Sequence, residues 1–115
     1  MKHLLKVLRA LSDPNRLRII QMLRHRPLCV CEITEILQLA TSTVSKHLSI
    51  LREATLITDL RDGKWVNYEP TATADPQIQA LLALIAEWLA DDKRVLEDQT
   101  RVSTVSRDII CGLDR

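Results

Sequence analysis

Three cysteines carry the strongest chemical signal in this sequence. Cys29 and Cys31 are separated by one residue, and Cys111 lies near the C-terminus. Thiolates are soft ligands that select soft or thiophilic metals, so two at this spacing favour a metal site. The odd number of cysteines, in a chain where we expect no export signal, argues against a disulfide framework. The pattern therefore predicts reduced thiols that take part in chemistry.

The spacing of Cys29 and Cys31 sets a condition on the backbone between them. Residues two apart on a continuous helix point about 200° away from each other, so both sulfurs face one ion only where the backbone bends. Pro27, just before a predicted helix, allows such a bend, and the positive end of that helix would favour the thiolate form. The alternative is a pair of small buried apolar side chains.

Three helices are expected to position this pair. The first ends at Ser12, and Asp13 followed by Pro14 starts the second, because Asp caps free backbone donors and Pro suits the first helical position. Pro27 separates the second helix from a short third one. The predicted inward stripes are Leu4, Leu8 and Leu11; Leu17, Ile20 and Leu23; and Val30, Ile33, Ile36 and Leu37.

A fourth helix and a hairpin follow. Thr41 or Ser42 can cap the helix, whose inward face would hold Val44, Leu48 and Leu51 and whose outward face is short or basic, as in a helix-turn-helix. Two strands, 57–60 and 64–69, flank Asp62-Gly63, a dipeptide typical of a two-residue turn. A long helix then begins at Asp75-Pro76. Its apolar residues are Ile78, Leu81, Leu82, Ile85, Trp88 and Leu89.

Charge and composition narrow the classes of function. The net charge is +1, yet residues 1–26 hold seven basic side chains against Asp13 alone, while residues 69–100 are acidic. This asymmetry indicates an oriented partner. The longest uncharged run, 76–86, is too short to cross a bilayer, so we expect a cytoplasmic protein with no membrane partner. The sequence has no phosphate loop or other enzyme motif, so we expect no enzyme and no organic cofactor.

Four segments, in order, resemble the ArsR/SmtB family of metal-responsive repressors. They are Leu-Ser-Asp-Pro-Asn-Arg-Leu-Arg-Ile-Ile (11–20), Leu-Cys-Val-Cys-Glu (28–32), Thr-Val-Ser-Lys-His-Leu (43–48) and Leu-Arg-Glu-Ala (51–54). The resemblance implies a mainly α winged helix-turn-helix with a small β-hairpin. It also implies a homodimer, built by the first and last long helices, that represses an operon until a metal binds. We expect residues 1–100 to form this DNA-binding and dimerisation domain and residues 101–115 a C-terminal tail.

The Cys-Val-Cys motif resembles that of the arsenic sensors, which implies that arsenic(III) or antimony(III), held by three thiolates, is the inducer. The third cysteine of those sensors is Thr34 here, so Cys111, from either protomer, is the candidate third ligand to Cys29 and Cys31. The family's usual Gly after the recognition helix is Thr55. Zinc fits less well, because the last helix lacks His.

The resemblance also implies contacts with double-stranded operator DNA. The candidates are Ser42, Thr43, Ser45 and Lys46 on the recognition helix, and Arg61 and Lys64 on the wing, with His47 at the edge of the buried stripe. His47 contacts a phosphate or packs at the helix edge. Metal binding beside the helix that precedes the recognition helix should lower DNA affinity.

Three alternatives remain open at this point. One is a redox or sulfide sensor in which Cys29 or Cys31 forms a disulfide with Cys111. Another is a sensor of a different thiophilic metal, such as cadmium or lead. A thiol enzyme such as an arsenate reductase is the weakest, because no anion-binding loop accompanies the cysteines.

Overall fold

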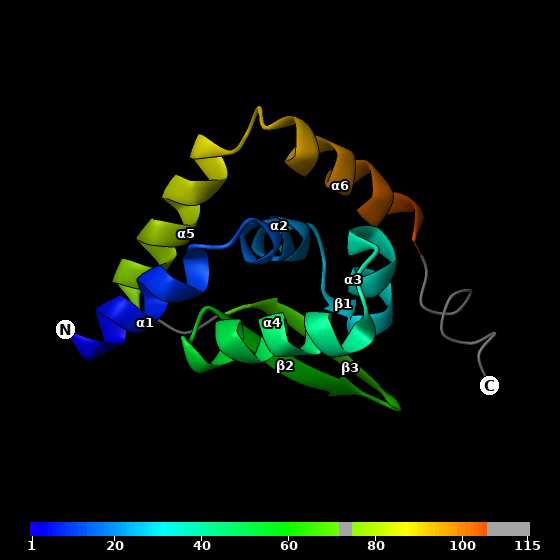
Figure 1. Cartoon of the computed structure of the whole chain (residues 1–115), viewed down its shortest axis with the longest axis horizontal. Coiled ribbons are helices and arrows are strands. Elements are labelled where there is room, and N and C mark those ends of the chain that lie inside the picture. The colour runs from blue at the N-terminus through cyan, green and yellow to red at the C-terminus, as the bar shows by residue number, and fades with distance from the viewer. Residues whose placement is uncertain (72–74, 106–115) are drawn as a thin grey trace.

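The computed structural model describes residues 1–71 and 75–105. This part of the chain forms helices around one three-stranded antiparallel sheet with the strand order β1-β3-β2. The elements are α1 (Lys2–Leu11), α2 (Pro14–Leu23), β1 (Leu28–Cys29), α3 (Val30–Leu37), α4 (Thr41–Glu53), β2 (Ile57–Asp62), β3 (Trp65–Pro70), α5 (Pro76–Trp88) and α6 (Lys93–Thr104). α1 and α5 lie at one end of the molecule, whereas α3 and the last turn of α6 lie at the other (Figure 1).

The predicted helix starts are confirmed at two positions and wrong at a third. Asp13 caps α2 by accepting a hydrogen bond from the backbone N–H of Asn15 at 2.8 Å, and Asp75 caps α5 in the same way. The cap of α4 is Ala40, not Thr41 or Ser42. Gln38, with a left-handed backbone, ends α3. The helix α4 already begins at Thr41, which is one residue too early for the Thr41 hydroxyl to cap it.

The sheet contains a strand that the sequence analysis did not predict. β1 pairs antiparallel with β3, with Leu28 opposite Tyr68 and Cys29 opposite Asn67. Two residues are too few to show a strand periodicity, so this pairing is visible only in three dimensions. It places the first cysteine at the edge of the sheet.

The hairpin is present, but its turn is one residue further along than predicted. Asp62 pairs with Trp65, which leaves Gly63 and Lys64 as the two turn residues. Gly63 has a φ of +62°, and this matches a turn with glycine at its first central position. Asp62 is therefore the last residue of β2 and not part of the turn.

Most of the predicted core is confirmed; Leu17 and Val30 are partly buried against it, and the exposed exceptions lie on α1 and α5. Ile20, Leu23, Ile33, Ile36, Leu37, Val44, Leu48 and Leu51 are buried. By contrast, Leu4 and Leu8 are 56% and 48% exposed, and Trp88 is 82% exposed. α1 instead turns Val7, Ala10 and Leu11 inward, because that face packs on α2 and α4. Leu4, Leu8 and Trp88 thus remain outside the core of the chain.

The helix α6 was not predicted. Its buried residues are Val95, Asp98 and Val102. Because a charged residue stands between the two valines, the sequence shows no continuous apolar stripe here. α6 packs on α2 and α3. Because the helix runs to Thr104, the expected tail from residue 101 begins inside it, while residues 106–115 lie outside the described part.

None of the helices in residues 1–71 and 75–105 combines the length and the apolar composition that a membrane span requires.

Candidate thiol site and nucleic-acid interface

The recognition helix presents its predicted contact residues to solvent. Ser42, Thr43, Ser45 and Lys46 are exposed on α4, while Val44 and the apolar residues a turn or more further along are buried against the core. Arg61 and Lys64 are exposed on the hairpin, and the Lys64 Nζ lies 5.4 Å from the centre of the Trp65 ring. Six of the seven predicted contacts are therefore exposed, and the seventh, His47, is half-buried.

His47 has a partner that the sequence analysis missed. Its Nδ1 lies 3.2 Å from Nη1 of Arg16 on α2. A guanidinium only donates hydrogen bonds, so Nδ1 of His47 is the acceptor in this contact. Arg16 also donates to the carbonyl oxygens of Ala10 at 2.7 Å and Arg9 at 3.2 Å, at the end of α1. One side chain therefore joins α1, α2 and the recognition helix.

Cys29 is buried at the junction of β1 and α3, where it is the N-cap residue of the helix. Its backbone N–H donates to Oε1 of Glu32 at 3.0 Å, and its side chain accepts from the backbone N–H of Glu32. This reciprocal pair is a capping box with cysteine in place of the usual hydroxyl residue. The sulfur is thus part of the local structure of α3.

The environment of Cys29 opposes the thiolate that the sequence analysis expected. Burial raises the pKa of the Cys29 thiol, and the Glu32 carboxylate adds to this effect. Two backbone N–H groups at the start of α3 lower the pKa, but burial and the carboxylate outweigh them. The expectation of a helix-stabilised thiolate was therefore wrong for Cys29, because the sulfur lies inside the protein.

The predicted bend between the two cysteines is confirmed. Cys29 has an extended backbone, with φ −89° and ψ 169°, whereas Cys31 is half-buried in the first turn of α3. Cys111 lies outside the described residues. Thr34 is on the next turn, and its Oγ1 is buried without a hydrogen-bond partner among the described residues. Within 1–71 and 75–105, no three His, Cys, Asp or Glu side chains are grouped to hold a metal ion.

An ion pair between a buried carboxylate and a partly exposed arginine supports this junction. Glu32 is 3% exposed, and its Oε2 lies 3.0 Å from Nη2 of Arg26. The same nitrogen donates to the carbonyl oxygens of Val102 at 3.0 Å and Val105 at 2.9 Å, at the end of α6. The three-residue spacing from Cys29 to Glu32 could have signalled the capping box. Nothing in the sequence indicated that Arg26 would contact α6.

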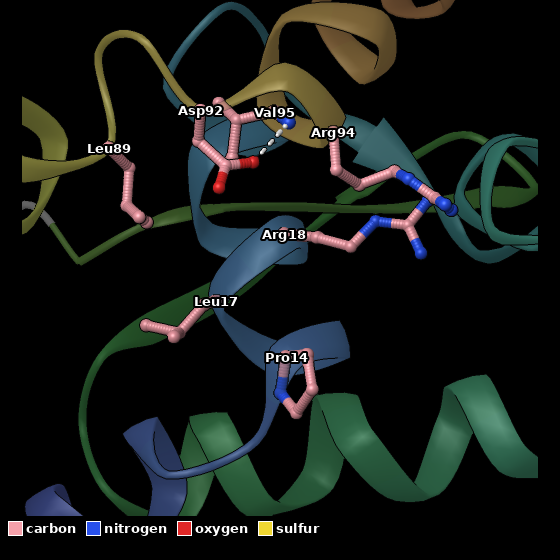
Figure 2. Close-up of a pocket in the computed structure, with 7 residues that line it drawn as sticks. All are labelled: Pro14, Leu17, Arg18, Leu89, Asp92, Arg94 and Val95. Atoms are coloured by element: carbon pink, nitrogen blue, oxygen red, sulfur yellow. Dashed lines mark hydrogen bonds between the residues drawn. The ribbon is translucent and has the colours of Figure 1, made fainter.

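A small pocket lies where the start of α2 meets the turn between α5 and α6 (Figure 2). The Arg18 guanidinium at this pocket is paired with Asp98, and the Asp92 carboxylate caps α6 by accepting from Val95 N–H at 3.0 Å. Arg18 and Asp92 at this pocket therefore already have partners within the protein. The full lining is Pro14, Leu17, Arg18, Leu89, Asp92, Arg94 and Val95.

A helix-turn-helix followed by a hairpin wing defines the class of winged helix-turn-helix regulators. Within that class, the model of the bacterial regulatory protein arsR family matches residues 13–59. The arsenic resistance transcriptional regulator ArsR1 of Pseudomonas putida is 36% identical over 91 residues, covering 75% of this chain and 71% of that protein. The arsenical resistance operon repressor of Escherichia coli is 33% identical over 94 residues, covering 79% and 77%. The chain belongs to the ArsR family.

Two solved structures share the fold, and a further relative in sequence is named for cadmium instead of arsenic. HlyU from Vibrio cholerae has a TM-score of 0.67 at 27% identity, covering 78% of this chain and 95% of that one. A homodimeric winged helix-turn-helix DNA-binding domain from Mycobacterium bovis has a TM-score of 0.66 at 25% identity, covering 79% and 81%. The cadmium resistance regulator CadC of Listeria innocua is 42% identical over half of each chain. The protein is a DNA-binding transcriptional regulator and not an enzyme.

Proposed function

We infer that the protein is a homodimeric repressor of an arsenic-resistance operon, released from operator DNA when arsenic(III) or antimony(III) binds its cysteines. The observation that carries this proposal is the position of the Cys-Val-Cys motif. Cys29 and Cys31 lie at the start of α3, and α3 packs directly on the recognition helix α4. A change at the thiols therefore acts on the element that precedes and supports the DNA-reading helix.

The donor set fits a trivalent, thiophilic ion. Thiolates are the soft ligands that such ions prefer, and Cys29 lies before the first turn of α3 with an extended backbone, so the 200° divergence of a continuous helix does not apply to the pair. The described residues supply two cysteine sulfurs, those of Cys29 and Cys31, and we assign Cys111 as the third ligand. Because thiols must lose their protons to bind a metal, binding releases protons and is weaker at low pH.

Release of DNA follows from the double role of Cys29. Drawing the Cys29 sulfur toward an ion shifts it from its place in the capping box, where it accepts from the backbone N–H of Glu32. The first turn of α3 then has to rearrange, and α3 is packed on α4. An allosteric coupling of about 1 to 3 kcal/mol, or roughly 5- to 150-fold in affinity, is typical of such linked sites.

The DNA-binding half of the proposal rests on exposed residues of α4 and the hairpin. Lys46 supplies a cation beside short polar side chains that suit base edges, and Arg61 and Lys64 can follow the phosphate backbone. We assign His47 the role of a positioning residue held by Arg16 at 3.2 Å. The few cations on this face require a second protomer for strong binding, and the apolar residues exposed on α1 and α5 provide a surface for it.

The test is fluorescence anisotropy of a labelled operator duplex, titrated with the protein and then with arsenite. Wild type should bind the operator and be released by arsenite, whereas Cys29→Ser and Cys31→Ser should bind equally well and remain bound. Serine is a good N-cap, so Cys29→Ser retains the capping box while removing the thiol. Lys46→Ala is the opposite control, because it should lose operator affinity at every arsenite concentration.

Unchanged anisotropy of the wild type at saturating arsenite would contradict the proposal. The same assay separates the alternatives when cadmium, lead, peroxide or a polysulfide replaces arsenite. Release by cadmium or lead alone would identify a different metal, in keeping with the cadmium regulator among the similar proteins. Release by oxidants alone would identify a thiol redox sensor.

A further inference from the structure

Arg16 has a partner for every nitrogen of its guanidinium group. Nε donates to the carbonyl oxygen of Ala10 at 2.7 Å, Nη2 donates to that of Arg9 at 3.2 Å, and Nη1 lies 3.2 Å from Nδ1 of His47. The first two partners lie in the last turn of α1, and the third is on the recognition helix α4. Because a guanidinium is a rigid plane of donors, these contacts fix the end of α1 relative to His47.

The backbone that carries Arg16 is held in place by the cap of α2. The Asp13 carboxylate accepts from the backbone N–H of Arg16 at 3.1 Å and from that of Asn15 at 2.8 Å. The Arg9 carbonyl oxygen also accepts from the Ser12 hydroxyl at 2.9 Å, at the turn between the two helices. The Arg16 side chain therefore extends from a fixed point between α1 and α2.

A directional contact of this kind restrains α4 in a way that its apolar face does not. Val44, Leu48 and Leu51 are buried, but apolar burial is non-directional and sets the rotation of a helix less sharply. A hydrogen bond instead weakens steeply when its angle departs from linear. His47 is at the half-buried edge of α4. A rotation of α4 about its own axis would therefore break the contact with Arg16.

The helix α1, at the other end of this connection, carries apolar residues proposed to meet the second protomer. Leu4 and Leu8 are exposed, whereas Val7 and Leu11 face the core of the chain. A partner packed on the exposed face fixes the position of α1, and Arg16 transmits that position to α4. In a symmetric dimer this happens in both protomers, so the connection sets the distance and the angle between the two recognition helices.

We propose that Arg16 determines which half-site spacing the dimer reads, because it fixes the recognition helix of each protomer relative to the α1 surface on which the partner packs. This inference rests on the dimer and the operator binding of the proposed function, and not on its inducer. The spacing of the half-sites in an operator must match the separation of the two recognition helices. Loss of Arg16 should therefore reduce discrimination between spacings.

The test compares two duplexes by fluorescence anisotropy. One is a two-half-site duplex that the wild type selects from a random pool, and the other has two base pairs inserted between its half-sites. The insertion rotates one half-site by about 70° relative to the other. The wild type should lose about 100-fold in affinity on insertion, whereas Arg16→Gln should lose less than about fivefold. Full discrimination by Arg16→Gln would overturn the proposal.

Arg9→Gln is the matched control, because it removes the same charge from the same helix junction. The Arg9 side chain is exposed and makes no hydrogen bond or ion pair within residues 1–71 and 75–105. This variant should discriminate between the duplexes as the wild type does. Arg16→Lys keeps the charge but has one nitrogen instead of three, so it should give an intermediate ratio. Equal losses of discrimination in Arg9→Gln and Arg16→Gln would show that charge alone is responsible.

A double-mutant cycle shows whether Arg16 acts through His47. Arg16→Gln should lower affinity for the selected duplex about tenfold in the wild type, but less than about twofold when His47 is already alanine. Equal losses in both backgrounds would contradict the proposed route. Circular dichroism on heating checks that each variant folds. A smaller folded fraction lowers affinity for both duplexes alike, so the ratio of the two affinities still reports the position of α4.

The same measurements separate this inference from the proposed function. A wild type that binds both duplexes equally would contradict the operator-binding dimer, and the inference would fail with it. A wild type that discriminates between the spacings, beside an Arg16→Gln variant that discriminates equally, would refute only the role of Arg16.

Discussion

Thr55 follows the end of α4 in a backbone conformation that is unfavourable for a threonine. It follows α4 with a φ of 64°, in the left-handed region that β-branched residues rarely adopt. The Leu56 N–H donates to the Leu51 carbonyl at 3.1 Å and the Thr55 N–H to the Arg52 carbonyl at 2.9 Å, the two bonds of a Schellman motif. The departure from glycine noted in the sequence has not changed the exit geometry, so it costs strain instead.

Thr55→Gly should therefore stabilise the protein. Relief of the strained φ outweighs the extra flexibility of glycine in the unfolded chain, for a net gain of about 1 kcal/mol in the free energy of unfolding. Urea denaturation followed by circular dichroism measures the change. Gln38→Gly, at the other left-handed position (φ 56°), is the control and should gain less, because glutamine is not β-branched. A loss of stability in Thr55→Gly would show that its 2.6 Å hydroxyl contact with the Ala54 carbonyl dominates.

Some residues of the site are positioned by the local sequence, and others by contacts with residues far away in the chain. The exposed face of α4 follows from helical periodicity alone, and the bend at Cys29 follows from Pro27 and the start of α3. The hydrogen bond between Arg16 and His47 joins residues 31 positions apart, and burial of the Cys29 thiol depends on pairing with Asn67 in β3. Such contacts leave no local pattern, which explains why they could not be predicted.

At the scale of elements, local signals defined the helices that begin with a cap and carry an apolar stripe. The Asp-Pro starts of α2 and α5 are two such cases. β1 and α6 lacked such a signal: β1 has two residues, and α6 buries a carboxylate between two valines. The position of α6 depends on Arg18, eighty residues earlier in the chain, so it is set by tertiary contacts and not by local sequence.

The ion pair between Arg18 and Asp98 is expected to be the main polar contact that holds α6. The Asp98 side chain is 4% exposed, and its hydrogen bond raises the pKa of Arg18, which keeps the guanidinium charged. Asp98→Asn removes the negative charge but not the volume, leaving a largely buried cation without its partner. We expect a loss of about 3 kcal/mol in the free energy of unfolding.

Chemical denaturation measures this loss, and hydrogen exchange of the α6 amides shows whether the helix loosens. Glu97→Gln is the matched control on the same helix, because Glu97 forms only an exposed ion pair with Arg94 at 3.8 Å. It should change stability by less than about 0.5 kcal/mol. Equal effects of Asp98→Asn and Glu97→Gln would mean that apolar packing, and not the ion pair, holds α6.

At the scale of the whole molecule, charge and apolar surface together explain why the net charge of +1 is compatible with binding DNA. The basic residues are concentrated in the first 26 positions, but residues 41–68 hold only four basic side chains against three acidic ones. In the proposed complex with DNA, one protomer would therefore make few phosphate contacts, and a dimer would double them. The surface available for dimerisation is the apolar one on α1 and α5, including Leu4, Leu8, Leu84 and Trp88.

Trp88→Glu should convert the protein into a folded monomer with weak DNA binding. The side chain is 82% exposed in the protomer, so its replacement leaves the core intact, while a charge in an apolar dimer interface is costly. Analytical ultracentrifugation should show one chain, and operator affinity should fall at least about 100-fold, because a monomer contacts one half-site. The dependence of log affinity on log salt should also become shallower, since fewer counterions are released.

Leu96→Glu is the control for this prediction. Leu96 is 45% exposed on α6, and its variant should remain dimeric. A Trp88→Glu protein that stays dimeric would place the interface elsewhere and require another source for the missing phosphate contacts.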